Sequence, residues 1–156
     1  MNLAEWAKHL NRQAETQKVR MHAAIVESGK LVEETAKENI GHLQPEKGPF
    51  EAWKPLAPST IEDKRRLGFD GSDHYKPLYR TGKMKASIDL VVFGNGFVVG
   101  SRDPVAGYQE FGTSRMPARP FIQPAMFTSL PAIHKIFGRV VVESVMPNPK
   151  GVRRRV

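Results

Sequence analysis

The sequence contains no proline between Leu3 and Ile40. Within this stretch, apolar or small residues recur in alternating steps of four and three, the spacing of one helix face. They are Leu3, Ala7, Leu10, Ala14, Met21, Ala24 and Leu31, with Ile25, Val32, Ala36 and Ile40 in an adjoining stripe. The pattern predicts one long amphipathic helix over residues 1–40, roughly 55 Å long.

A helix of that length exceeds the width of a compact domain of 156 residues. Part of it is therefore expected to pack on something other than its own chain. Because glycine is a weak point in a helix, the alternative is two shorter helices folded back on each other at Ser28-Gly29.

Residues 41–146 are predicted to form an α+β core. Residues 41–58 hold four prolines and two glycines, so they predict an ordered loop. Ser59 and Glu62 have the spacing of a capping box for a short basic helix that ends at Gly68.

The period then changes to that of a β-hairpin. The segment "SIDLVVFGNGFVVGS" joins two β-branched runs at Gly94-Asn95-Gly96. Val91 and Phe93 point to the face opposite Ile88, Leu90 and Val92, so both faces are apolar and both need cover.

The C-terminal part returns to helical spacing. Pro124 suits a first helical position, and Pro131 is expected to kink or divide this helix. Residues 147–156 are predicted to be a flexible basic tail. The predicted fold class is α+β in a single domain, 1–156, with a long N-terminal helix, a small antiparallel sheet built on a central hairpin, short helices and a kinked C-terminal helix.

The charge is +8, and all of it comes from the residues after position 40. Such a balance favours a polyanionic neighbour, either nucleic acid or an acidic protein, while the plainer alternative is a solvated basic surface. Lys64, Arg65 and Arg66, and Arg153, Arg154 and Arg155, are the candidates for contact with DNA. No apolar run is long enough to span a membrane, no signal peptide is expected, and the lack of cysteine suits synthesis in a cytoplasm.

Motifs for chemistry are missing. The five histidines lack metal-ligand spacing, and "GNGFVVG" joins two strands, whereas a dinucleotide loop opens a helix. Neither a cysteine nor a G-x-S-x-G serine offers a nucleophile. We therefore expect no enzyme activity, no cofactor and no metal.

The segment "YQEFGTSRMPARPFIQPAM" crowds aromatics, prolines and arginines between Tyr108 and Met126. Gly112 can end a short helix, and Pro117 and Pro120 hold their predecessors extended. We expect a stiff ledge for protein contacts, and the alternative is a loop whose aromatics plug the core. The candidate interface residues are Tyr108, Phe111, Gly112, Arg115, Met116, Arg119, Pro120 and Phe121, together with Val91 and Phe93 of the hairpin.

This segment resembles the Y-x-x-F-G-T-x-x-M-x-A-R-P-F signature of tail-completion proteins of tailed bacteriophages. "WKPLAPST" at Trp53–Thr60 and "LYRTGKMKASI" at Leu78–Ile88 resemble motifs of the related virion-morphogenesis family. The motifs occur in the family's order over residues 50–127. The sequence departs from the pattern at Met84, where leucine is usual, and in its long N-terminal helix and basic tail.

The resemblance implies a structural, non-enzymatic subunit of the phage neck, at the head–tail junction of the virion. Such proteins form rings around the DNA channel, here expected to be hexameric, with a dodecamer as the alternative. Implied neighbours are the connector or stopper, the tail-tube or terminator proteins, and DNA that passes without sequence-specific contact. The alternative function is a small basic protein that binds DNA non-specifically. A toxin-like or regulatory module has no positive support.

Overall fold

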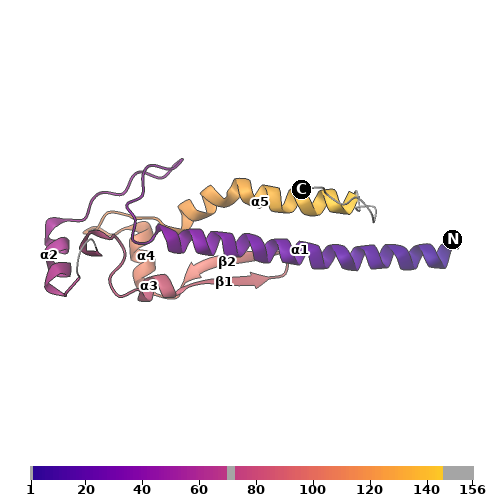
Figure 1. The fold of residues 1–156 in the computed structure, drawn as a ribbon, viewed down its shortest axis with the longest axis horizontal. Coiled ribbons are helices and arrows are strands. Elements are labelled where there is room, and N and C mark those ends of the chain that lie inside the picture. The colour runs from indigo at the N-terminus through magenta and orange to yellow at the C-terminus, as the bar shows by residue number, and fades with distance from the viewer. Residues whose placement is uncertain (1, 70–72, 146–156) are drawn as a thin grey trace, which may run out of the picture.

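One long helix, α1 (Leu3–Asn39), dominates the molecule, and the other elements gather around its C-terminal half and beyond its C-terminal end (Figure 1). The computed structural model describes residues 2–69 and 73–145. A capping box starts the helix, because Asn2 Oδ1 accepts from Glu5 N at 2.9 Å and Glu5 Oε2 accepts from Asn2 N at 3.0 Å. The prediction of a single helix is confirmed, and the alternative of two helices is wrong.

Gly29 lies in the middle of α1 and serves close packing. A Cβ atom there would lie 2.4 Å from Leu90 Cδ1 and 3.2 Å from Phe97 Cγ. The missing side chain therefore lets the sheet approach the helix, and the hydrogen bonds of α1 continue past it.

Strands β1 (Ile88–Phe93) and β2 (Gly96–Ser101) form an antiparallel hairpin with a two-residue turn at Gly94-Asn95. Val91 pairs with Val98, and Leu90 pairs with Val99. The face that carries Leu90 and Val99 lies against α1. Among the described residues no third strand joins this sheet.

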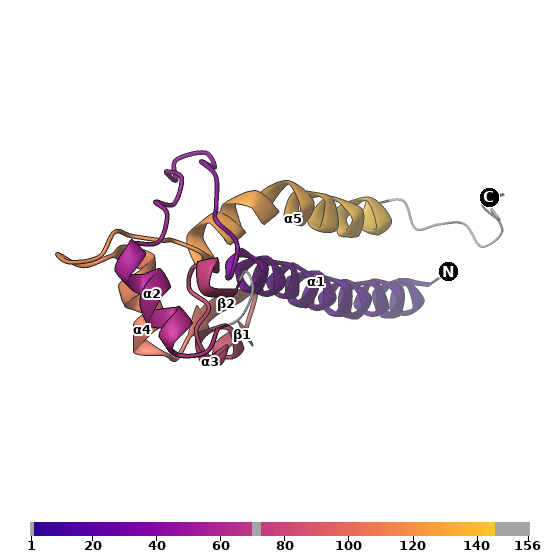
Figure 2. The ribbon, with the colours of Figure 1, turned by 60° about the vertical axis from the view of Figure 1, so that its left-hand side comes forward.

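Helix α5 (Ile122–Val145) lies antiparallel beside α1 (Figures 1 and 2). Ile136 and Val140 pack on Ala24 of α1. The helix begins before Pro124, which occupies its first turn, where a missing N–H costs no hydrogen bond. Pro131 does not divide the helix, although the ribbon arches in its first half in Figure 1.

Short elements close one end of the molecule: α2 (Pro58–Arg66), a 3₁₀ turn η1 (Asp73–Tyr75), α3 (Lys83–Ala86) and α4 (Pro104–Phe111). The predicted capping box of α2 is wrong, because the helix starts with Pro58 at its first position, so its N-cap is Ala57 and not Ser59. Its predicted stop is confirmed: Gly68 has φ +84°, and Phe69 N donates to Lys64 O at 3.2 Å.

The main core lies where α1, the hairpin, α4 and the start of α5 meet. Its buried members are Val32, Ala36, Ile40, Trp53, Met84, Ile88, Ala106, Phe121, Ala125 and Ile133. The fold class is α+β, as predicted, and the packed core covers only the C-terminal half of α1.

Candidate assembly interface

The segment between α4 and α5 forms a tight loop that projects at the end of the molecule away from the N-terminus (Figure 2). Gly112 ends α4 with φ +73°, and a Cβ atom there would lie 2.7 Å from Ala118 N. Thr113 and Met116 exchange backbone hydrogen bonds of 2.9 and 3.2 Å. Only glycine satisfies both the positive φ and the close approach.

Glu110 of α4 caps α5. Its buried carboxylate accepts from Phe121 N at 2.8 Å, Gln123 N at 2.9 Å and Ile122 N at 3.1 Å. These N–H groups open a helix and lack partners inside it, and a carboxylate also suits the positive end of the helix dipole. No local pattern in the sequence points to Glu110, because this cap comes from another helix.

Arg119 is buried, with 8% of its surface exposed, so the prediction that it is displayed for a partner is wrong. Its Nη2 donates to Lys54 O at 3.2 Å and lies 3.4 Å from Pro55 O. Its backbone N donates to Gln109 O at 2.7 Å. Burial lowers the pKa of the Arg119 guanidinium. Arg119 is thus an internal clamp between the loop before α5 and the loop before α2.

Phe121 is fully buried. For this residue the alternative prediction, an aromatic side chain that fills the core, is confirmed. Its carbonyl accepts from Asn39 Nδ2 at 2.9 Å, and the carbonyl of half-buried Pro120 accepts from Trp53 Nε1 at 3.2 Å. Together with Glu110 and Arg119, these contacts join the end of α1, the Trp53 loop, α4 and α5. We call residues 109–123 and their partners the clasp.

The rest of the predicted ledge is open to a partner. Tyr108 is 58% exposed and Phe111 is 74% exposed, Arg115 is exposed, and Met116 and Gly112 are half-buried. The segment therefore combines a buried anchor with an exposed aromatic surface.

The hairpin face turned away from α1 is also exposed. Val91, Phe93 and Val98 each leave more than half of their surface uncovered, at 52%, 56% and 53%. The register places Val98 directly opposite Val91 and Phe93 opposite Gly96, so these three side chains form one patch, the outer hairpin face. Val98 was not predicted, although the alternation of β2 and the turn position carry the signal.

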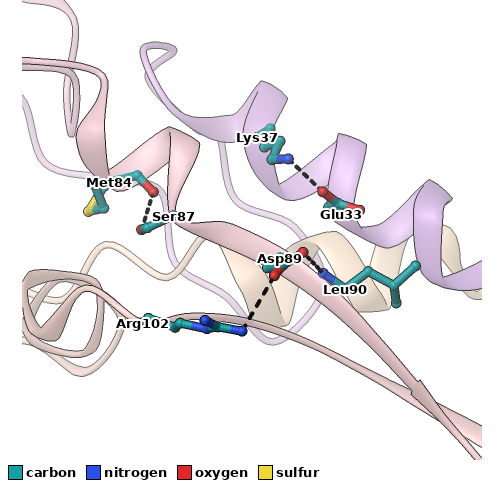
Figure 3. Close-up of polar contacts among 7 residues, drawn as sticks. All are labelled: Glu33, Lys37, Met84, Ser87, Asp89, Leu90 and Arg102. Carbon is teal, nitrogen blue, oxygen red and sulfur yellow. Dashed lines mark hydrogen bonds and ion pairs between the residues drawn. The ribbon is translucent and has the colours of Figure 1, made fainter.

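A charged side chain, that of Asp89, lies at the free edge of β1. Asp89 Oδ1 accepts from Leu90 N at 2.9 Å, and Asp89 Oδ2 lies 3.8 Å from Arg102 Nη2 (Figure 3). Charged side chains at a sheet edge discourage the addition of another strand. The geometry therefore favours contact through the outer hairpin face over pairing at the β1 edge.

On the other side of the hairpin, β2 and α5 border an apolar groove of about 510 Å³. Phe97 and Val99 of β2, and Met126 and Phe137 of α5, are among its lining residues. This groove was not foreseen, because no local pattern shows that α5 returns beside β2.

Of the predicted basic cluster 64–66, Arg65 and Arg66 are exposed but Lys64 is not. Lys64 is buried, and its Nζ donates to Lys76 O and Tyr79 O, each at 2.6 Å. Arg65 Nη2 bonds Tyr75 Oη at 3.0 Å, and Arg66 pairs with Asp63 at 2.7 Å. The predicted exposure of Lys64 is thus wrong, because its ammonium holds the loop after α2. Arg153, Arg154 and Arg155 lie outside the described residues.

Within the described part of the chain, no three His, Asp or Glu side chains gather as metal ligands would, and no helix there could cross a membrane. The chain matches no protein-family model, no curated protein and no solved structure.

Proposed function

We propose that this protein is a structural subunit of the neck of a tailed bacteriophage, a tail-completion or head–tail joining protein. In this proposal, six copies form a ring around the DNA channel at the head–tail junction of the virion. Connector or stopper proteins lie on one side of the ring and tail-tube or terminator proteins on the other. DNA passes through without sequence-specific contact.

One support is the place of the family-like motifs in the fold. Trp53 Nε1, in "WKPLAPST", donates to the carbonyl of Pro120, in the segment Tyr108–Met126. Two of the motifs, far apart in the sequence, thus lie together in the fold, which fits a family defined by its architecture.

The observation that carries the proposal is the amount of apolar surface left uncovered in a single copy. The outer hairpin face, Tyr108 and Phe111 are exposed on the body of the molecule. Apolar patches of this kind commonly mark interaction sites. A ring needs two different surfaces that meet around its axis, and a chain with several separate exposed surfaces can supply them.

The test is native mass spectrometry of the full-length protein, followed by imaging of any ring. We expect a hexamer mass in the wild type and its loss in the double variant Val91→Ser/Val98→Ser. The matched control is Val141→Ser/Val142→Ser, which removes two equally exposed valines, 55% and 60%, from α5. A wild-type chain that stays monomeric and is absent from purified virions contradicts the proposal.

Non-specific DNA binding is the alternative function. Its support is the charge of +8, while the burial of Lys64 weakens its predicted contact cluster. A DNA binder should bind duplex at physiological salt, with an affinity that falls steeply as salt rises. A neck subunit needs no such affinity, so this measurement separates the two functions.

A further inference from the structure

The first turns of α1 extend beyond the other described helices and strands (Figure 1). Among the described residues, the hydrogen bonds from α5 to α1 extend as far as Gln17, whose Oε1 accepts from Ser144 Oγ, while Arg20 Nη1 donates to Glu143 O at 3.3 Å. Residues 3–16 are all exposed. We call them the arm.

The arm carries an uncovered apolar seam. Its members are Leu3, Ala7, Leu10 and Ala14. Leu3 is 84% exposed and Leu10 is 45% exposed, and neighbouring Trp6 is 49% exposed. The same four-three repeat continues at Ala24 and Leu31, where Ile136 and Val140 of α5 cover it. The arm therefore presents the same kind of helix-packing surface as the covered part of α1, but without the second helix.

Charges are kept away from this seam. At 100° per residue, every ionisable side chain of the arm lies on the far side of the helix. These residues are Glu5, Lys8, His9, Arg12 and Glu15. The positions that flank the seam are uncharged, namely Ala4, Trp6, Asn11 and Gln13. A second helix can thus lie on the seam without burying a charge.

The order of leucine and alanine along the seam suits a second arm as the partner helix. If a second arm runs antiparallel, Leu3 faces Ala14 of the other copy, and Ala7 faces its Leu10. Every layer then holds one leucine and one alanine, which packs evenly. In a parallel pair, alanine would face alanine and leucine would face leucine, so the layers would alternate between loose and crowded.

The chain's own C-terminal residues are a poor occupant of the seam. Residues 146–156, "MPNPKGVRRRV", follow the end of α5 but contain two prolines and four basic residues, and they lack a four-three apolar repeat.

We propose that two copies of this protein pair through their arms in antiparallel orientation. The contact is the same on both copies and closes with two of them, so it is separate from the ring contacts proposed above. It covers the arm of the free protein before any assembly. Four layers make a short seam, so the pairing is weak and depends on concentration.

Cysteine cross-linking tests the pairing, because the chain contains no cysteine. Leu3→Cys and Ala14→Cys variants are purified separately, then oxidised alone and as a mixture. In the antiparallel pair these positions face each other, whereas two copies of the same position lie about 16 Å apart along the helix. A disulfide needs Cα atoms within about 7 Å. We therefore expect disulfide dimers in the mixture, at least tenfold above either variant alone.

The control mixture is Glu5→Cys with Arg12→Cys, which match in height but lie on the far side of the helix. It should cross-link no more than its single variants. Disulfides within each single variant, or a Leu3→Cys and Ala14→Cys mixture equal to the control, would overturn the proposal.

A second measurement avoids cysteine. In sedimentation equilibrium, Leu10→Glu places a charge in two layers of the pair and should raise the dimer Kd at least tenfold, while Arg12→Glu should leave it unchanged. Equal effects of the two variants would also overturn the proposal. Ring formation by the wild type is scored separately by native mass, so either proposal can fail alone.

Discussion

Glu110 and Arg119 are charged residues that the fold has buried, and each bonds backbone groups, although Arg119 Nε is buried without a partner among the described residues. Glu110 receives three N–H groups at the start of α5, and Arg119 donates to carbonyls of the Trp53 loop. A buried charge without such partners would be strongly unfavourable. Their position in the clasp therefore indicates a structural role for both side chains.

Arg119→Ala should lower the free energy of unfolding by about 1–3 kcal/mol, because Lys54 O and Pro55 O lose a charged donor. Urea unfolding at a protein concentration low enough to prevent assembly measures the change. The control is Arg115→Ala, an exposed arginine in the same loop, which should shift the value by less than about 0.5 kcal/mol. Equal stability of the two variants would show that the Arg119 hydrogen bonds contribute nothing.

Lys64 should make stability depend on pH. Burial, partly offset by Asp73 and reinforced by Arg80, lowers the pKa of folded Lys64 below its ordinary value of 10.5. Between the two pKa values the unfolded chain binds more protons, so the free energy of unfolding rises with pH in that interval. Neutral Lys64 can still donate to Lys76 O and Tyr79 O.

The measurement is urea unfolding of the wild type and Lys64→Met at several pH values up to 10.5. The wild type should gain stability relative to the variant as pH rises. Lys76 does not obscure this interval: its hydrogen bond to Asp73 raises its pKa, so its stabilising contribution is lost only above 10.5. A constant difference between the two proteins would contradict the prediction.

At the scale of elements, the packing of α1 on the hairpin depends on one glycine. Gly29 of α1 and Gly138 of α5 both lie inside helices, but only Gly29 has a neighbouring element within 4 Å of where a Cβ would be. The two positions therefore separate helix propensity from packing.

Gly138→Ala should raise the free energy of unfolding by about 0.5–1 kcal/mol through its helix propensity. Gly29→Ala gains the same propensity, but its new methyl must displace Leu90 and press on Phe97, which costs about 1–3 kcal/mol. We expect Gly29→Ala to be less stable than wild type. Chemical unfolding of both variants checks this, and an equal gain in both would mean that the hairpin moves freely away from α1.

At the scale of the whole molecule, we expect the arm to be removable without loss of the remaining described fold, which we call the body. Deleting residues 1–14 should leave the thermal midpoint of the body nearly unchanged and remove only helical signal in circular dichroism, because the side chains of residues 2–14 are exposed. A longer deletion through Ser28 also removes buried Ala24 and Ile25, and should lower the midpoint by several degrees. A large loss with the short deletion would show that the arm stabilises the body.

Local patterns in the sequence determined the long helix and the hairpin. The repeat from Leu3 to Ile40 predicts helix, with only a break at Ser28-Gly29 left open, and Gly94-Asn95 between β-branched runs predicts a tight hairpin turn. The same alternation placed Val91 and Phe93 on the face opposite Leu90, whereas the packing of α1 decided which face is covered. The helix and the hairpin turn depend on residues close in the chain, so periodicity and turn chemistry are sufficient to predict them.

Tertiary contacts decided which residues of the candidate interface are buried. Arg119 lies inside because Lys54 and Pro55 pass beside it, and Phe121 lies inside because Asn39 at the end of α1 bonds its carbonyl. Lys64 is buried because the chain returns to offer it two carbonyls. Burial in an irregular segment depends on which backbone groups from distant parts of the chain contact that segment. Such contacts produce no periodic pattern in the sequence, so the sequence alone does not predict them.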